Sequence, residues 1–186
     1  MLRVILVSLA ALVVVAIVMH SSGLTPGEAE RQLLLAELNA EEGAAYRSAN
    51  RLRPGVLALP DDLQVEVLEL GDGAQPHGDD WVQVHYRAAH IDGRVFEDSR
   101  RGGEPATVPV NRTIAGWQRV LVDTPVGSRL RLVIPPALAY GRGGGGPVGP
   151  EETLVFEIEL LAIVPAPESP STERDPLQQA VPGLGG

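Results

Sequence analysis

Short segments in which apolar and polar side chains alternate, divided by glycine and proline, make up residues 63–161. Val82, Val84 and Tyr86, for example, alternate with polar neighbours. A period of two places every second side chain on one face of an extended chain, which is typical of half-buried β-strands. The pair Asp92-Gly93 supplies a turn whose positive φ angles match the twist of a hairpin. These segments are therefore expected to form antiparallel strands.

Only one short helix is expected in this region, over residues 114–121, and it carries Trp117. Two further alternating runs, residues 129–134 and 153–161, complete the strand pattern, the first of them stopped by Pro135-Pro136. Many short strands with a single helix indicate an α+β domain, in which an antiparallel sheet of about five strands wraps around that helix.

The aromatic residues are scarce and are concentrated in the strand region. The chain has seven Phe, Trp and Tyr residues, and six of them lie between Trp81 and Phe156. Because they are distributed over separate strands and turns, folding can bring them together. The sequence therefore predicts one aromatic-lined pocket.

The N-terminus carries an unbroken apolar run, residues 4–19, with Arg3 on its outer side. Spanning a bilayer normally takes ~20 residues, so the membrane segment would use residues 2–24. We expect an uncleaved signal anchor in residues 1–24, with a cleaved signal peptide as the alternative. The positive-inside rule keeps Arg3 in the cytoplasm and sends the rest of the chain across the membrane.

Composition excludes several classes of function. The net charge is -9, which opposes binding to a phosphate backbone, so nucleic acid is not an expected partner. The chain has no cysteine, and its four histidines lack the spacing of metal ligands. No cofactor or metal is expected, and the glycine-rich residues 141–147 are interpreted as a mobile flap rather than a phosphate loop, since no Lys-Ser or Lys-Thr follows.

Thr25, Pro26 and Glu28 carry the signals of a helix start, and the helix is expected to end near Asn50 within a spacer segment of residues 25–58. Its apolar stripe is short, and charged residues including Arg47 are expected to face water. Two interpretations remain open: a solvated spacer, or a helix that pairs with a second copy. The stripe consists of Leu34, Leu35, Leu38, Ala45 and Ala49. Residues 165–186 have too little apolar content to fold and are expected to form a disordered tail.

Several motifs follow one another in a fixed order between about residues 57 and 164. They include Val84-His85-Tyr86, Asp92-Gly93, Phe96, Gly116-Trp117, Ile134-Pro135-Pro136, Ala139-Tyr140-Gly141 and residues 153–161. Their order and spacing resemble the FK506-binding-protein (FKBP) family of peptidyl-prolyl cis-trans isomerases, and the segment around residues 105–111 resembles the bacterial exported branch that includes the Mip and FkpA types. The resemblance implies an FKBP-like half-open sheet over residues 59–164. In this branch the helix that precedes the domain joins two copies, although the helix here is shorter.

The resemblance also implies the roles of individual residues. Trp117 would form the floor of a substrate pocket, the backbone N–H of Ile114 would donate to a substrate carbonyl, and the hydroxyl of Tyr140 would also donate. Tyr140, Glu97 and Phe96 are the implied catalytic residues. The implied substrate-binding residues are Tyr86, Phe96, Val108, Thr113, Ile114, Trp117, Tyr140 and Phe156.

The chain departs from the family pattern in three places. Glu97 and Asp98 stand where Asp and Ser are usual, and we expect the extra methylene of Glu97 to disturb the pairing of its carboxylate with a tyrosine. Val108 replaces an aromatic wall residue, and the flap has four consecutive glycines. We therefore expect an intact fold, weak isomerase activity, and weak binding of macrolides of the FK506 type.

The leading hypothesis is a prolyl isomerase that is anchored in a bacterial inner membrane, faces the periplasm and assists the folding of exported, proline-containing polypeptides. After signal cleavage it would instead be soluble in the periplasm. One rival is a proline-binding chaperone or interaction module with little catalytic activity. Another is a scaffold whose helix and tail recruit partners.

Overall fold

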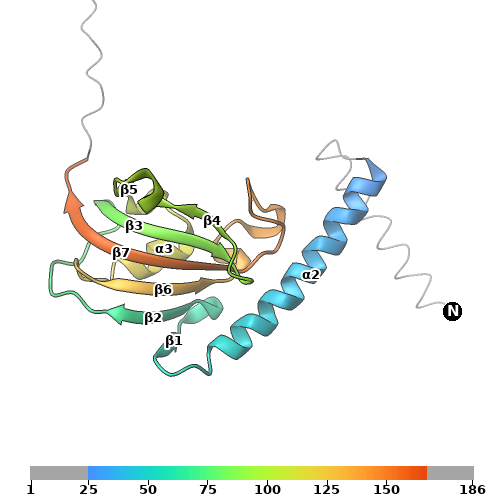
Figure 1. Cartoon of the computed structure of the whole chain (residues 1–186), viewed down its shortest axis with the longest axis horizontal. Helices are drawn as coiled ribbons and strands as arrows, with labels where there is room; N and C mark the ends of the chain where they lie inside the picture. Colours follow the sequence, from blue (N-terminus) through green and yellow to red (C-terminus); the bar gives the residue numbers. More distant parts are fainter. Residues whose placement is uncertain (1–24, 167–186) are drawn as a thin grey trace, which may run out of the picture.

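The structure, a computed structural model, describes residues 25–166 (Figure 1). It is an α+β domain in which one sheet packs against a short helix, α3 (Ala115–Leu121), while a long helix, α2 (Pro26–Asn50), runs past one end of the sheet. The strands are β1 (Val56–Ala58), β2 (Gln64–Glu69), β3 (Trp81–His90), β4 (Val95–Asp98), β5 (Ala106–Pro109), β6 (Arg129–Ile134) and β7 (Leu154–Val164).

All strand pairings are antiparallel, in the order β1-β2-β6-β7-β3-β4, with β5 also paired to β3. The predicted antiparallel sheet around one helix is confirmed, but the expected number of about five strands is wrong, because the sheet has seven. Two strands were not counted: β5, and β1, which lies inside the segment expected to be a spacer. Three residues are too few to display an alternating pattern, and β1 is defined only by its pairing with β2.

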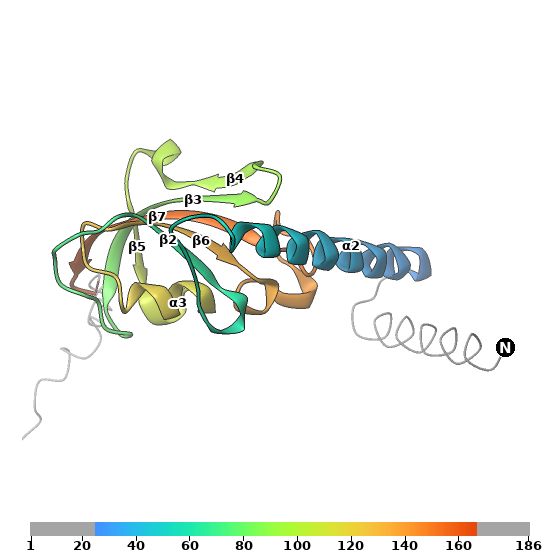
Figure 2. The ribbon, with the colours of Figure 1, turned by 90° about the horizontal axis from the view of Figure 1, so that it is seen from below.

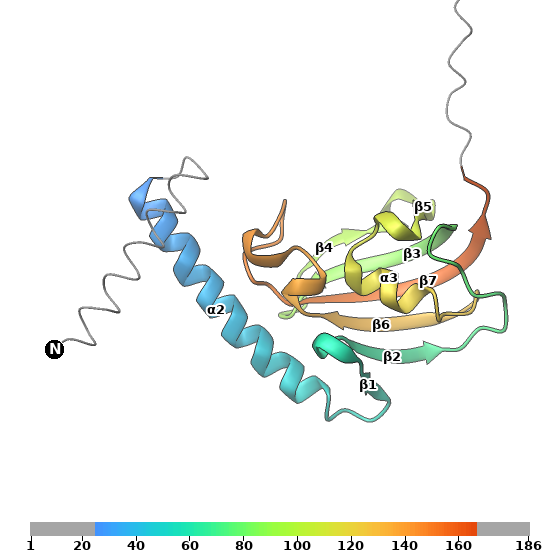
Figure 3. The same ribbon diagram turned by 180° about the vertical axis from the view of Figure 1, so that it is seen from behind.

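The two faces of the sheet differ in chemistry. The inner face packs on α3, which covers that side of the sheet in Figure 3. A Cβ atom at Gly116 would lie 2.7 Å from Ile134 Cγ2, so the missing side chain lets α3 press directly on β6. The fully buried residues of this core include Leu63, Val82, Val84, Leu121, Leu132, Ile134, Leu154, Ile158 and Leu160.

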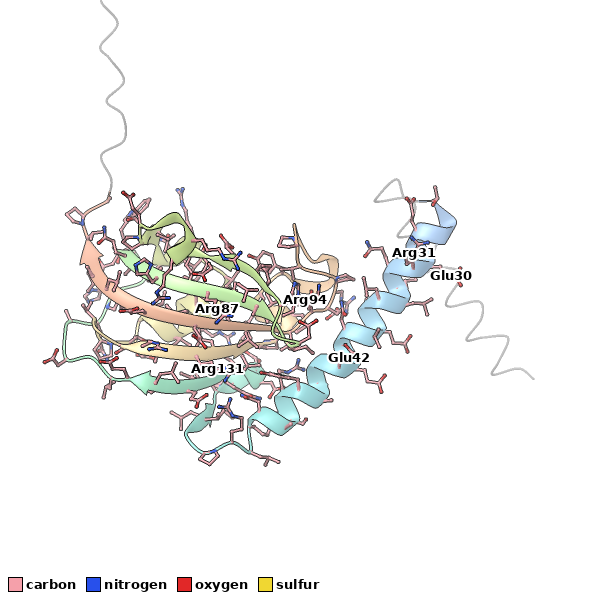
Figure 4. All side chains as sticks on the ribbon, viewed as in Figure 1. Glu30, Arg31, Glu42, Arg87, Arg94 and Arg131 are labelled. Atoms are coloured by element: carbon pink, nitrogen blue, oxygen red, sulfur yellow. The ribbon has the colours of Figure 1, made fainter. Side chains whose placement is uncertain are left out.

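The outer face carries a row of alternating charges. Directly paired positions run across five strands as Glu66, Arg131, Glu157, Arg87 and Asp98; Arg87 and Arg131 are labelled in Figure 4. Opposite charges on directly facing positions stabilise neighbouring strands. The main apolar cluster lies on the α3 side, where the candidate site also lies, although Val133 and Val155 are buried on the outer face.

The start of α2 matches the sequence signals. The side chain of Thr25 accepts from the backbone N–H of Glu28, and the Glu28 carboxylate accepts from the Thr25 N–H at 2.9 Å, which forms a capping box. The helix runs to Asn50, as expected.

The face by which α2 docks on the domain is polar, and the expectation that Arg47 faces water is wrong. Arg47 Nε lies 2.7 Å from Asp62 Oδ2, and the buried Asn50 Nδ2 donates to Gln64 Oε1 at 2.8 Å. The stripe leucines instead remain exposed, with exposed fractions of 61% for Leu34 and 50% for Leu38. The N-terminal half of α2 extends beyond the sheet (Figure 2).

The expected membrane segment, residues 1–24, and most of the expected tail, residues 167–186, lie outside the described residues. Among the helices between residues 25 and 166, none is both long and apolar enough to cross a membrane.

Candidate active site

A cavity of about 290 Å³ opens on the α3 side of the sheet, between β3, β4, β5, the start of α3 and the loop that begins at Tyr140. Its lining is largely apolar and aromatic, with few charged groups. The lining residues are Tyr86, Glu97, Val108, Pro109, Arg112, Thr113, Ile114, Trp117, Tyr140 and Phe156. A concave apolar site with a few polar groups at its edge is typical of a small-ligand or peptide pocket.

Trp117 forms the base of this cavity. Its ring is 5% exposed and meets two other rings edge to face, Phe156 at 5.5 Å and Tyr86 at 5.3 Å between centroids. Edge-to-face pairs at these distances are favourable and hold each ring in one orientation. The floor is thus a rigid apolar surface supplied by α3, β7 and β3.

One wall contains a hydrogen bond between two side chains of the sheet. The hydroxyl of Tyr86 donates to the carboxylate of Glu97, which lies on β4. Burial raises the pKa of the Tyr86 phenol above its usual range, and the hydrogen bond and negative charge of Glu97 raise it further. The extra methylene of Glu97 does not prevent this pairing, contrary to expectation.

Two hydrogen-bond donors at the cavity are free. The backbone N–H of Ile114, at the start of α3, donates to no acceptor within residues 25–166, and neither does the hydroxyl of Tyr140. Tyr140 is 41% exposed. The hydroxyl of Thr113, in contrast, donates to the Val110 carbonyl at 2.7 Å, so it shapes the wall without offering a donor.

The glycine-rich loop after Tyr140 is closed by backbone hydrogen bonds. Gly145 and Val148 bond to each other through both N–H groups, at 2.9 and 3.0 Å, and the Val148 side chain is buried. A Cβ atom on Gly145 would lie 3.3 Å from Tyr140 Cδ1, so the loop backbone packs closely against the tyrosine ring.

The structure brings together eight of the nine site residues predicted from sequence; the exception is Phe96. Its ring lies against His90, 5.0 Å between centroids, and is absent from the cavity lining. The register of β3 and β4 shifts here, because Ala88 faces Glu97 while Ala89 faces Val95, which leaves Phe96 unpaired in a β-bulge. Bulges redirect side chains, and this one affects Phe96, whereas Glu97 pairs with the buried Ala88 and so lies on the inner face.

Sequence reasoning missed two lining residues, Pro109 and Arg112. Both lie in residues 108–114, next to predicted site residues. A strand that ends in a turn beside the pocket exposes consecutive side chains to it, and that signal could have identified them.

The comparisons with known proteins agree with this geometry. A family model described as FKBP-type peptidyl-prolyl cis-trans isomerase matches residues 73–161. The crystal structure of FkpA from Escherichia coli superposes with a TM-score of 0.73 at 35% identity, covering 76% of this chain and 68% of that one. The chain belongs to the FKBP-type peptidyl-prolyl cis-trans isomerase family.

Two curated relatives place this FKBP domain in the Mip and FkpA branch. The FKBP-type 22 kDa peptidyl-prolyl cis-trans isomerase of Escherichia coli K12 is 48% identical over 126 residues, which are 67% of this chain and 61% of the relative. The outer membrane protein MIP of Legionella longbeachae is 43% identical over 129 residues, 69% of this chain and 55% of the relative. The chain therefore spans a little over half the length of these relatives.

Within residues 25–166, the FKBP chain has no group of three or more His, Cys, Asp or Glu side chains that could hold a metal ion. The cavity offers an apolar surface, two free donors and the Tyr86–Glu97 pair.

Proposed function

We propose that the protein is a peptidyl-prolyl cis-trans isomerase that binds X-Pro segments of polypeptides in the Trp117 cavity. The observation that carries the proposal is the pairing of a rigid aromatic floor with two free donors, the Ile114 N–H and the Tyr140 hydroxyl. A proline ring fits an apolar floor, and the amides on either side of it need donors.

The reaction makes no bond and breaks none. Resonance keeps the amide planar and sets a barrier of ~18 to 20 kcal/mol, so uncatalysed exchange takes ~10 to 100 s. The planar amide is more polar than the twisted one. Transfer into a cavity whose floor residue Trp117 is only 5% exposed therefore destabilises the ground state more than the transition state.

Each donor has a distinct role in the proposal. The N–H of Ile114 is fixed by the backbone at the start of α3 and anchors one carbonyl of the substrate. Tyr140 stands on the loop side, where its hydroxyl donates to the carbonyl that turns. A thousandfold acceleration requires only ~4 kcal/mol, which desolvation and two hydrogen bonds can supply together.

The test is a protease-coupled assay with a proline-containing tetrapeptide. We expect the wild-type protein to accelerate isomerisation and Tyr140→Phe to lower kcat/KM about fivefold to tenfold, the effect of one lost hydrogen bond. Tyr46→Phe is the control, because it removes the same atom from a residue on α2 outside the cavity, where the hydroxyl accepts only a long hydrogen bond of 3.4 Å from Arg131.

Failure of the wild-type protein to accelerate the reaction, combined with measurable binding of the same peptide, would replace the proposal with the alternative of a proline-binding module. Equal loss of activity in Tyr140→Phe and Tyr46→Phe would remove Tyr140 from the site.

Weak binding of macrolides of the FK506 type is part of the proposal. Val108 supplies an aliphatic wall, and no residue of the loop 141–150 is among those lining the cavity. Less apolar surface is therefore available to a large ligand than with an aromatic wall. Val108→Phe should tighten FK506 binding in a fluorescence titration, and an unchanged affinity would contradict this account of the wall.

We further propose that the protein acts on exported, proline-containing clients at the bacterial envelope, held to the inner membrane by residues 2–24. The support is the apolar run at residues 4–19 and the similarity to a relative described as an outer membrane protein. Carbonate extraction of membranes tests the anchor: retention in the pellet is expected, and release into the soluble fraction indicates cleavage.

A homodimer through α2 is also proposed. Leu34, Leu35 and Leu38 are 61%, 41% and 50% exposed on the half of the helix that extends beyond the sheet. Sedimentation of the wild type should give twice the mass of the variant Leu34→Glu/Leu38→Glu. A monomeric wild type would contradict the proposed dimer.

A further inference from the structure

The loop that starts at Tyr140 is held at its far end, residues 149–153, by contacts with the β3–β4 hairpin and with α2. This loop connects β6 to β7, is drawn in orange, and lies beside α2 in Figures 1 and 3. Its near end lines the cavity through Tyr140. The Glu151 N–H donates to the Gly141 carbonyl at 3.1 Å, so the contacts that fix the far end also bear on the position of the neighbouring Tyr140.

The first anchor is Glu152. One carboxylate oxygen accepts from the backbone N–H of Gly149 at 2.7 Å, and the other contacts Nδ1 of His90. The side chains of Glu152 and His90 are only 14% and 10% exposed. A contact shielded from water in this way is stronger than one on the surface.

His90 connects this anchor to the opposite wall of the cavity. It ends β3 and closes the turn of the β3–β4 hairpin, where its N–H donates to the Arg94 carbonyl at 2.9 Å. The same hairpin carries Glu97, the partner of Tyr86. The Glu152–His90 contact thus joins the two segments that contribute Tyr140 and Glu97 to the cavity.

The second anchor is on α2. Asn39 Nδ2 donates to the Pro150 carbonyl at 2.8 Å. One turn further along the helix, a Cβ atom on Gly43 would lie 2.3 Å from Thr153 Oγ1, so only glycine permits this close approach. Between the two anchors Glu151 has φ 53°, a left-handed conformation that a non-glycine residue adopts only where its surroundings impose it.

We infer that Glu152 and Asn39 are positioning residues for the isomerase reaction. Because Asn39 lies on α2, this helix contributes to catalysis and is more than a spacer. The inference rests on the proposed function. Glu152 fixes the loop against the β3–β4 hairpin and Asn39 fixes it against α2, and together they place the Tyr140 hydroxyl over the cavity.

Amide hydrogen exchange tests the anchors independently of activity. Exchange of the Gly145 and Val148 N–H groups, which bond across the loop, should become about tenfold faster in Glu152→Ala and in Asn39→Ala, since local opening then needs fewer broken contacts. The matched controls are Glu104→Ala and Glu42→Ala, two exposed residues of which Glu42 lies on α2 (Figure 4). Asn39→Asp should behave like Asn39→Ala, because it keeps the size and loses the donor.

A double-mutant cycle tests the catalytic consequence. Glu152→Ala and Asn39→Ala should each lower kcat/KM about tenfold in the wild-type background and by less than twofold in the Tyr140→Phe background, because the group they position is then missing. A purely structural effect would lower the activity equally in both backgrounds.

If the amide exchange rates of Gly145 and Val148 are unchanged in both Glu152→Ala and Asn39→Ala, the anchoring is overturned, whatever the activity of these variants. Faster exchange with equal losses of activity in the two backgrounds overturns the positioning role. Absence of isomerase activity in the wild type overturns the proposed function instead, and the anchoring is then decided by exchange alone.

Discussion

The hydroxyl of Tyr86 donates a hydrogen bond to the carboxylate of Glu97 across the β3–β4 pair, at the edge of the cavity. The bond holds one ring of the aromatic floor, because Tyr86 also contacts Trp117 edge to face. Glu97→Gln keeps the shape and replaces the carboxylate by a weaker, neutral acceptor. We expect it to weaken peptide binding about threefold to tenfold, measured by isothermal titration. Glu104→Gln, on an exposed residue outside the cavity, is its control, and equal affinities would show that the pair does not orient the floor.

The same pair predicts loss of stability at alkaline pH. Burial, as the larger cause, and Glu97, as the second, hold the pKa of Tyr86 above its ordinary value of 10.0. Above pH 10.0 the folded protein therefore keeps a phenol proton that the unfolded chain releases. The stabilising contribution is complete below pH 10.0 and declines as the pH rises toward the folded pKa. Urea unfolding between pH 8 and pH 11 should show a fall in the free energy of unfolding that Tyr86→Phe reduces. A fall of the same size in the variant would assign it to other groups.

Two substitutions at Trp117 distinguish the contribution of its ring to packing from the contribution of its N–H. The ring is buried, and Nε1 has no hydrogen-bond partner within residues 25–166. Trp117→Ala should lower the free energy of unfolding by ~3 to 5 kcal/mol, whereas Trp117→Phe, which retains an aromatic ring and loses no hydrogen bond, should lower it by ~1 to 2 kcal/mol. Urea denaturation measures both, and equal losses would indicate that the N–H is hydrogen-bonded in solution.

Acid should weaken the docking of α2. Burial alone would raise the pKa of Asp62, but the hydrogen bond and charge of Arg47, with the charge of Arg51, outweigh it and hold the pKa below its ordinary value of 3.8. The stabilising contribution is therefore present above pH 3.8 and is lost as the pH falls through the folded pKa. Asp62→Asn should be less stable than the wild type at pH 7, and the difference should shrink toward pH 2 in urea unfolding. A difference that stays constant with pH would exclude an ionic contribution.

At Gly43, the higher helix propensity of alanine is opposed by a steric clash with another part of the fold. Alanine is favoured over glycine inside a helix by ~1 kcal/mol, yet a Cβ atom here would overlap the side chain of Thr153, whose branched carbon cannot move freely. We expect Gly43→Ala to destabilise the protein by ~1 to 3 kcal/mol in thermal or urea unfolding. Gly27→Ala, at a position of the same helix where a Cβ atom meets nothing within 4 Å, should be neutral or stabilising. A stabilised Gly43→Ala would mean that α2 does not dock as described.

Local patterns determined the strands and most of the site. Alternation within residues 82–86 requires one apolar face whatever its partner strand, so β3 could be predicted from sequence. The site residues could be predicted because the family motifs that carry them keep their order and spacing along the chain. Trp117, for instance, lies on a helix whose position against the sheet follows from its apolar face.

Tertiary structure decided how those elements meet. The docking of α2 through Asn39, Arg47 and Asn50 could not be predicted, because polar contacts leave no hydrophobic period in the sequence and their partners lie up to 111 residues away. The direction of Phe96 depends on a β-bulge, which is a property of two paired strands and not of either one. The sequence by itself thus determined an α+β domain with an aromatic pocket, because burial patterns are local. Only the folded chain decided which polar groups fix the walls of that pocket, because hydrogen bonds depend on distances that the fold sets.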